Sequence, residues 1–266
     1  MRVDETKCVG CGNCVLVCTM GAIYIENGHS KVNEDECVEC GSCKRFLEVE
    51  GRNPTLVRGL RKVLKKVSLQ YDAPVGVCVA GALYQPTLEW PRSVRRDFSD
   101  PAAVHASTGI PGRGTEEIKT NDVSGWLQEG EALLLIEVGR PGLGARLRDL
   151  EKITTALATL GVDFKPENPI TLLMPDAKTG QLNPEILNEK VLSAIIEIKI
   201  DLDKVPVYLE KIKETVKDFP TVCSLVVAGR CNKHGDIPYI DAVGTAGLAL
   251  STGGKTNLGL GRGGNE

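Results

Sequence analysis

The cysteines are the residues of this sequence whose type and spacing point most directly to chemistry. Ten are present, and eight of them lie within the first 78 residues. One run has the spacing C-x2-C-x2-C-x3-C, and the next has the spacing C-x2-C-x2-C. The eight are Cys8, Cys11, Cys14, Cys18, Cys37, Cys40, Cys43 and Cys78. Because thiolate sulfur is a soft metal donor, thiols this closely spaced indicate metal binding in a reducing compartment.

An internal repeat connects Cys78 to the second run. Cys18 is followed by Thr-Met-Gly-Ala-Ile-Tyr, and Cys78 is followed by Val-Ala-Gly-Ala-Leu-Tyr. Cys78 is therefore the expected fourth cysteine of the second run, displaced by the inserted residues 44–77. Three cysteines spaced by two residues can surround one cube of iron and sulfide. Gly10, Gly12 and Gly41 allow the tight turns that this requires.

On these motifs, residues 1–98 resemble the bacterial-type dicluster [4Fe–4S] ferredoxins, which carry single electrons. In that family, the fourth cysteine of each run binds the cluster of the other run. The resemblance therefore implies two [4Fe–4S] clusters. One would be held by Cys8, Cys11, Cys14 and Cys78, and the other by Cys37, Cys40, Cys43 and Cys18. The sequence departs from the family at Thr19 and Val79, where proline is usual, and in the long insertion.

Zinc is the alternative metal for these cysteines. Zinc ribbons and fingers use paired C-x2-C knuckles, and a third cysteine two residues on, with a fourth three residues later, fits that pattern poorly. A disulfide scaffold would need an oxidising compartment. The first residues, MRVDETKC, lack the apolar stretch of a secretory signal, so we expect a cytoplasmic protein.

The composition excludes several classes of protein. Hydrophobic residues make up 42% and charged residues 25%, which is close to the average for globular domains. The net charge of −3 predicts neither nucleic-acid binding nor attraction to anionic lipid. The longest apolar run, residues 132–136, is far shorter than the roughly 20 residues of a membrane-spanning helix.

Residues 44–77 interrupt the ferredoxin-like segment and predict a helix. Apolar residues recur at helical spacing, and basic residues occupy the other faces. The apolar set is Leu56, Leu60, Val63, Leu64 and Val67, and the basic set is Arg58, Arg61, Lys62, Lys65 and Lys66. We expect the apolar side to pack on the ferredoxin core. The alternative is a docking face for an acidic redox partner protein.

The remaining chain predicts a second domain of α+β class. Residues 131–230 have the order β-α-β-β-α-β, with strands expected near 132–138, 169–174, 192–200 and 222–227. Helices are expected at 147–160 and 203–218. This pattern is similar to that of the ferredoxin-like superfold, including ACT-type regulatory modules, although many functions share that fold. The whole chain would then be a dicluster ferredoxin domain followed by a ferredoxin-like sandwich.

Two segments flank this second domain. Residues 99–130 form an expected polar connecting loop, either an ordered connector or a small-molecule site near His105, Arg113, Glu116 and Arg140, with Glu117 beside them. Residues 231–266 form a Gly-rich C-terminal segment. Gly254-Lys255-Thr256 mimics the end of a P-loop without its earlier glycine. Cys223, Cys231 and His234 offer a weak third metal site.

The sequence favours an electron-transfer protein that passes single low-potential electrons to or from an oxidoreductase, or to a protein that needs reductive activation, in anaerobic metabolism. An iron–sulfur oxidoreductase subunit with a substrate site in the second domain is the alternative, and a ligand-gated redox sensor is another. No Cys–His or Ser–His pairing at recognisable spacing supports a stand-alone enzyme. Homo-oligomerisation is left open.

Overall fold

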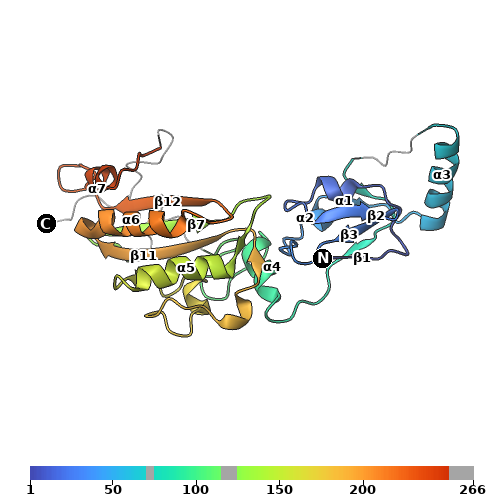
Figure 1. Ribbon diagram of the computed structural model, residues 1–266. Coiled ribbons are helices and arrows are strands. Elements are labelled where there is room, and N and C mark those ends of the chain that lie inside the picture. The colour runs from blue at the N-terminus through green and yellow to red at the C-terminus, as the bar shows by residue number, and fades with distance from the viewer. Residues whose placement is uncertain (70–74, 115–124, 252–266) are drawn as a thin grey trace.

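The computed structural model describes residues 1–69, 75–114 and 125–251. Two lobes lie end to end, as Figure 1 shows. The described residues between 1 and 84 form the first lobe, and the second lobe begins at Ser93. The fold is of mixed α+β class. Among the described residues, no helix has both the length and the apolar character needed to cross a membrane.

The first lobe is held together by short strand pairs, two antiparallel and one parallel among the described residues. Its elements are β1 (Arg2–Val3), α1 (Asn13–Leu16), β2 (Ile23–Glu26), β3 (His29–Val32), α2 (Ser42–Arg45), β4 (Glu48–Val49), α3 (Pro54–Lys66), β5 (Val77–Cys78) and β6 (Leu83–Tyr84). β2 and β3 form a hairpin around the turn at Asn27-Gly28. β1 pairs with β6, so the two ends of this lobe meet.

The insertion leaves and re-enters the first lobe at one place, because β4 and β5 pair in parallel with Val49 opposite Cys78. Between them, α3 begins at Asn53, whose side chain accepts hydrogen bonds from the amides of Thr55 and Leu56. The expectation that the apolar stripe of this helix packs on the ferredoxin core is wrong. Of that set Leu64 is half-buried, and Leu56, Leu60, Val63 and Val67 are exposed; the buried residue of the helix is Val57.

The second lobe is built on a four-stranded sheet of order β12-β7-β11-β9, and every neighbouring pair is antiparallel. Its strands are β7 (Glu131–Val138), β9 (Asp163–Phe164), β11 (Ala194–Asp201) and β12 (Cys223–Gly229). With α5 (Leu147–Ala158) and α6 (Val205–Val216), the chain order is β7-α5-β9-β11-α6-β12. A further pair joins β8 (Ala145–Arg146) to β10 (Lys190–Val191).

One expected strand is absent. The apolar residues at 169–174 form a 3-10 turn, η1 (Thr171–Leu173), and the second strand of the sheet is the short β9. The side chain of Asn168 explains the turn, because it accepts a hydrogen bond from the amide of Ile170 and donates to the carboxylate of Glu197. The remaining 3-10 turns are η2 (Pro184–Ile186) and η3 (Leu202–Lys204).

Both long helices cover the same face of the sheet, as Figure 1 shows. Strand residues such as Leu134 and Ile196 alternate toward this face and pack in one core with Leu150 and Ile153 of α5 and Leu209 of α6. The alternate strand residues, including Leu133 and Ile195, face the other side, where Leu127 covers them.

The core of the second lobe extends beyond residues 131–230 on both sides. Val94 and Phe98 of α4 (Ser93–Ser99) lie in this core, although residues up to 98 were expected in the ferredoxin domain. Tyr239 and Val243 of α7 (Tyr239–Thr245) lie in it as well. The packing of α4 on the second lobe places its arginines between the two lobes.

Candidate metal centres

Four cysteines from three parts of the first lobe line one pocket. They are Cys8, Cys11, Cys14 and Cys78, and the empty space of this pocket, together with the open solvent at its mouth, is about 350 Å³. Cys8 and Cys14 are buried, and Cys11 and Cys78 are partly exposed. We call this the first pocket. The sequence places Cys78 far from the other three, and the fold brings it to them.

Two contacts deliver Cys78 to the first pocket. The parallel pairing of β4 with β5 fixes the strand that carries it. The side chain of Asn13, which is part of α1 beside Cys14, donates a hydrogen bond of 2.8 Å to the carbonyl of Val77. The cysteine at the end of the long insertion is therefore anchored directly to the loop of the first run.

The other four early cysteines line a second pocket. They are Cys18, Cys37, Cys40 and Cys43, and the empty space of this pocket, again with the open solvent at its mouth, is about 320 Å³. Met1, Met20, Ala22, Ile23 and Val38 supply an apolar wall. Each pocket thus takes three cysteines from one run and the fourth from the other repeat, which is the grouping expected from the resemblance.

Burial and mutual repulsion act on the thiols of both pockets. Burial, followed by the neighbouring thiols of Cys11, Cys8 and Cys78, raises the pKa of Cys14 to about 11. Burial also raises the pKa of Cys43 to about 12, with Cys40, Cys18 and Cys37 as the next causes. Four adjacent thiolates need a positive centre to hold them, and coordinated metal supplies that charge. This donor set fits a metal cluster.

Hydrogen-bond donors face several of the sulfurs. The amide of Ser30 donates to Cys8 Sγ at 3.2 Å, and its hydroxyl lies 3.1 Å from Cys14 Sγ. The amide of Ala22 donates to Cys18 Sγ at 3.2 Å. The hydroxyl of Thr19, at the position where the ferredoxin family usually has proline, lies 3.3 Å from Cys40 Sγ. Such contacts tune the potential of an iron–sulfur cluster. Spacing alone gave no signal for Ser30, because the β2–β3 hairpin brings it to the pocket.

The pockets suit a cluster better than a single ion. In the described ranges, no three His, Cys, Asp or Glu side chains form a group that could hold one metal ion. The thiols instead line two pockets in sets of four, and four thiolates are the ligand set of one [4Fe–4S] cluster. The alternative third metal site at Cys223, Cys231 and His234 is not supported by the described residues, because these three form no such group.

The turn at Gly10 is crowded as well as left-handed. Gly10 has φ +66°, and a Cβ atom there would lie 2.1 Å from the carbonyl oxygen of Gly28 in the β2–β3 turn. Gly12 has φ +87°, and a Cβ atom there would meet nothing within 4 Å. Gly12 is therefore needed for its backbone conformation alone, whereas Gly10 is needed both for its conformation and for the lack of space around it.

We predict that Gly10→Ala destabilises the first pocket more than Gly12→Ala does. The left-handed conformation costs about 1–2 kcal/mol in both variants, and the clash adds about 1–3 kcal/mol in Gly10→Ala alone. The measurement is the urea concentration at which half of the iron is released from the anaerobic protein. Equal midpoints for the two variants would contradict the crowding of Gly10 against the hairpin.

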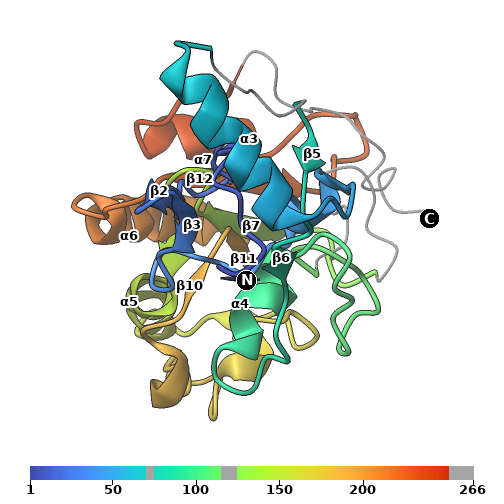
Figure 2. The ribbon, with the colours of Figure 1, turned by 90° about the vertical axis from the view of Figure 1, so that its right-hand side faces the viewer.

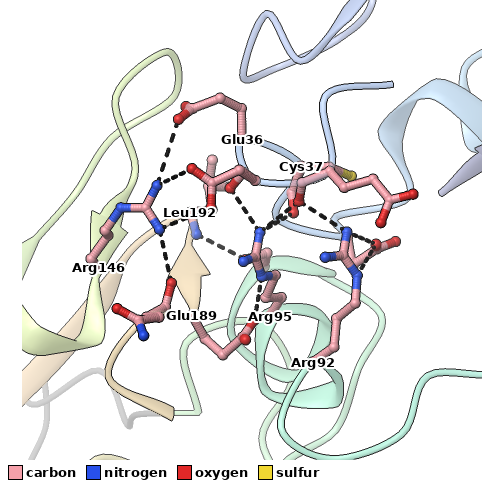
Figure 3. Close-up of polar contacts among 12 residues, drawn as sticks. Glu36, Cys37, Arg92, Arg95, Arg146, Glu189 and Leu192 are labelled. Atoms are coloured by element: carbon pink, nitrogen blue, oxygen red, sulfur yellow. Dashed lines mark hydrogen bonds and ion pairs between the residues drawn. The ribbon is translucent and has the colours of Figure 1, made fainter. Parts of the chain in front are cut away.

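The second pocket lies beside the junction of the two lobes, and Figure 3 shows the arginines that connect them. Arg95 of α4 is 4% exposed. Its Nη1 donates to the backbone carbonyls of Glu34, Asp35 and Cys37 at 3.0, 2.8 and 2.9 Å. Its Nε donates to the carboxylate of Glu189, in the second lobe. One buried side chain thus connects the loop that ends at Cys37 to the other lobe.

Further polar contacts strengthen this junction. Arg146 of β8 pairs with Asp35, and this hydrogen bond holds the pKa of the Asp35 carboxyl below its usual range. Lys190 of β10 pairs with Glu36. The amide of Gly142 donates to the carbonyl of Thr19, the residue after Cys18, at 2.7 Å. Both cysteine segments of the second pocket therefore have contacts with the second lobe.

The expected small-molecule residues of the second lobe are engaged in internal contacts. His105 is buried, its Nε2 lies 3.0 Å from the carbonyl oxygen of Gly112, and its ring packs edge-on against Phe98. Arg113 and Arg140 both pair with Glu137 of β7, each at 3.2 Å. Glu116 and Glu117 lie outside the described residues. The two arginines therefore meet through a shared carboxylate, which sequence reasoning missed.

Comparison with protein families identifies the N-terminal segment. The 4Fe-4S binding domain family matches residues 1–24, which contain the first cysteine run and its Gly-Ala extension. Neither the curated proteins nor the solved structures gave a match. The first lobe therefore begins with a ferredoxin-type iron–sulfur domain that binds a [4Fe–4S] cluster, and domains of this kind serve in electron transfer.

Proposed function

We propose that this protein carries single low-potential electrons through two [4Fe–4S] clusters. The first cluster is held by Cys8, Cys11, Cys14 and Cys78 in the first pocket. The second cluster is held by Cys37, Cys40, Cys43 and Cys18 in the second pocket. The observation that carries the proposal is that all eight early cysteines line two pockets of four, each drawing on both cysteine repeats.

When bound, such clusters supply reversible one-electron chemistry. The chain's own residues bind and insulate them. Cys14 of the first pocket and Cys43 of the second lie in one buried apolar group with Met1, Ile23 and Leu47. Ser30 and Ala22 direct amide hydrogens at the sulfurs, which stabilises the negative charge that an added electron brings.

The electrons pass to or from a partner oxidoreductase or a protein that needs reductive activation, in anaerobic metabolism. An oxidoreductase subunit with a substrate in the second lobe is the second candidate, and it would use the region of Arg113 and Arg140. Because both arginines are paired with Glu137, we favour the carrier.

The test is metal and sulfide analysis of the protein purified without oxygen. We predict about eight iron and about eight sulfide atoms per chain, with visible absorption that bleaches on reduction by dithionite. Each pocket should hold half of the iron and half of the sulfide. Zinc in place of iron would overturn the proposal, and about four irons per chain would restrict it to one cluster. A bound flavin or corrinoid would favour the oxidoreductase subunit.

A further inference from the structure

Helix α3 presents an apolar stripe to solvent. Leu56, Leu60, Val63 and Val67 follow one another at spacings of four, three and four residues, so they lie on one side of the helix. Their exposed fractions are 73%, 48%, 59% and 60%. A surface helix normally buries such a stripe. A row of exposed aliphatic side chains with polar neighbours is typical of an interaction site.

The rest of the α3 surface is strongly basic. Five of the thirteen residues of the helix are Arg or Lys, and none is Asp or Glu. The chain as a whole carries a net charge of −3, so positive charge is concentrated on this helix. Lys62, Lys65 and Lys66 are exposed beside the apolar stripe. An acidic surface with an apolar centre is the complement of this arrangement.

Contacts fix α3 against the first pocket. Arg58 Nε donates to the carbonyl of Cys8 at 3.1 Å, and Arg61 Nη2 donates to the carbonyl of Gly10 at 3.2 Å. Val57 packs with Val9 and Val79, which both line the first pocket. Figure 2, which faces the end of the first lobe, shows α3 in front of the rest of that lobe. A partner seated on α3 is therefore separated from the first pocket by little more than the helix.

We propose that the exposed face of α3 is the docking surface for an acidic redox protein that exchanges electrons with the first cluster. The inference rests on the proposed function. One electron leaves the reduced first cluster and reduces the acceptor protein by one electron, with no bond formed or broken. The two arginine contacts place the docked protein about 10–12 Å, one helix diameter, from the cluster loop.

The charge of α3 is tested in the full-length, cluster-loaded protein. The triple variant K62E/K65E/K66E reverses three exposed charges and leaves Arg58 and Arg61 in place. The protein is reduced with dithionite, freed of excess reductant, and mixed in a stopped-flow instrument with an acidic flavodoxin as one-electron acceptor. At low ionic strength we expect the second-order rate constant to fall about tenfold or more, because electrostatic steering is lost.

A matched control separates local charge from net charge. The variant K178E/K217E/K233E changes the net charge by the same amount through three exposed lysines of the second lobe. We expect its rate constant with flavodoxin to stay within about threefold of the wild-type value, because the net charge changes equally while the docking face on α3 keeps its own lysines. The apolar stripe is tested with L60S/V63S, for which the loss of rate should persist at high ionic strength.

Four outcomes would overturn the docking surface while leaving the proposed function intact. One is a rate unchanged in both α3 variants, and another is an equal loss in the second-lobe control. A third is that K62E/K65E/K66E abolishes sedimentation with phosphatidylserine vesicles but not transfer to flavodoxin. The fourth is that L60S/V63S dissociates a homodimer without slowing transfer. Wild-type protein that lacks reducible iron would instead refute the proposed function itself.

Discussion

Replacing Cys78 by alanine is expected to reduce the iron content from about eight to about four atoms per chain. The variant leaves Cys8, Cys11 and Cys14 with three thiols around the first pocket. Because a [4Fe–4S] cluster in this arrangement needs a fourth protein ligand, the first cluster is lost or becomes labile. The second pocket keeps all four of its cysteines, so its cluster should remain. Iron and sulfide analysis of the anaerobic protein gives the result directly.

Two companion variants make the result specific. Cys43→Ala should remove the second cluster and spare the first, since Cys43 lines the other pocket. Cys223→Ala should leave the iron content unchanged, because this partly buried cysteine lies on β12 in the second lobe. Full iron content in Cys78→Ala would contradict the assignment of Cys78 as a ligand, and iron loss in Cys223→Ala would show that the assay reports general instability.

The cysteine grouping could be anticipated because ligand spacing is a local property of sequence. The Cys-x2-Gly-Ala repeat was enough to associate Cys78 with the second run, although an insertion separates them. The structure shows how Cys78 is held at the first pocket. β4 pairs with β5, and Asn13 donates a hydrogen bond to the carbonyl of Val77. Neither contact has a signature in the sequence, because each joins residues far apart along the chain.

The elements of the second lobe were predictable where the hydrophobic pattern extends over many residues. β7, β11, α5 and α6 all show a clear pattern over eight residues or more, and each lies within a few residues of its expected place. The strand expected at 169–174 failed because a short apolar run does not distinguish a strand from a buried turn. There, the buried Asn168 side chain fixes the turn geometry through a tertiary partner, Glu197.

Helix α3 shows the opposite kind of failure. The amphipathic pattern correctly predicts a helix. The further expectation, that its apolar side packs against the ferredoxin core, is wrong. The period of a pattern indicates which residues share a face and does not indicate what covers that face. In the structure, Val57 and the two arginines make the contacts with the cluster loop, and the leucine and valine stripe points away.

Among residues that are not themselves proposed ligands, Arg95 is the one whose replacement we expect to affect the second cluster most. Arg95→Met removes the donor shared by three carbonyls and leaves the carboxylate of Glu189 without this partner. Breaking a buried ion pair by removing one side costs about 3–5 kcal/mol. Because two of the carbonyls belong to Asp35 and Cys37, the second cluster should be released at lower urea concentrations than in the wild-type protein.

The same substitution should lower the reduction potential of the second cluster. A buried positive charge favours the state that has gained an electron, so its removal makes reduction harder. For scale, one unit charge at a separation of about 10 Å and an effective dielectric constant of about 20 contributes about 1.7 kcal/mol, which is about 70 mV for one electron. A redox titration followed by electron paramagnetic resonance measures both clusters, and the first cluster serves as an internal reference.

Two further variants separate charge from geometry. Arg95→Lys keeps the positive charge and loses the planar set of donors, so it should retain most of the potential while the cluster remains easier to release. Arg148→Met removes an equivalent charge from an exposed position of α5 and should change neither property. Arg95 holds the loop of Cys37, and of the two pockets only the second contains this cysteine. Equal shifts of the two reduction potentials in Arg95→Met would therefore contradict the placement of this arginine at the second pocket.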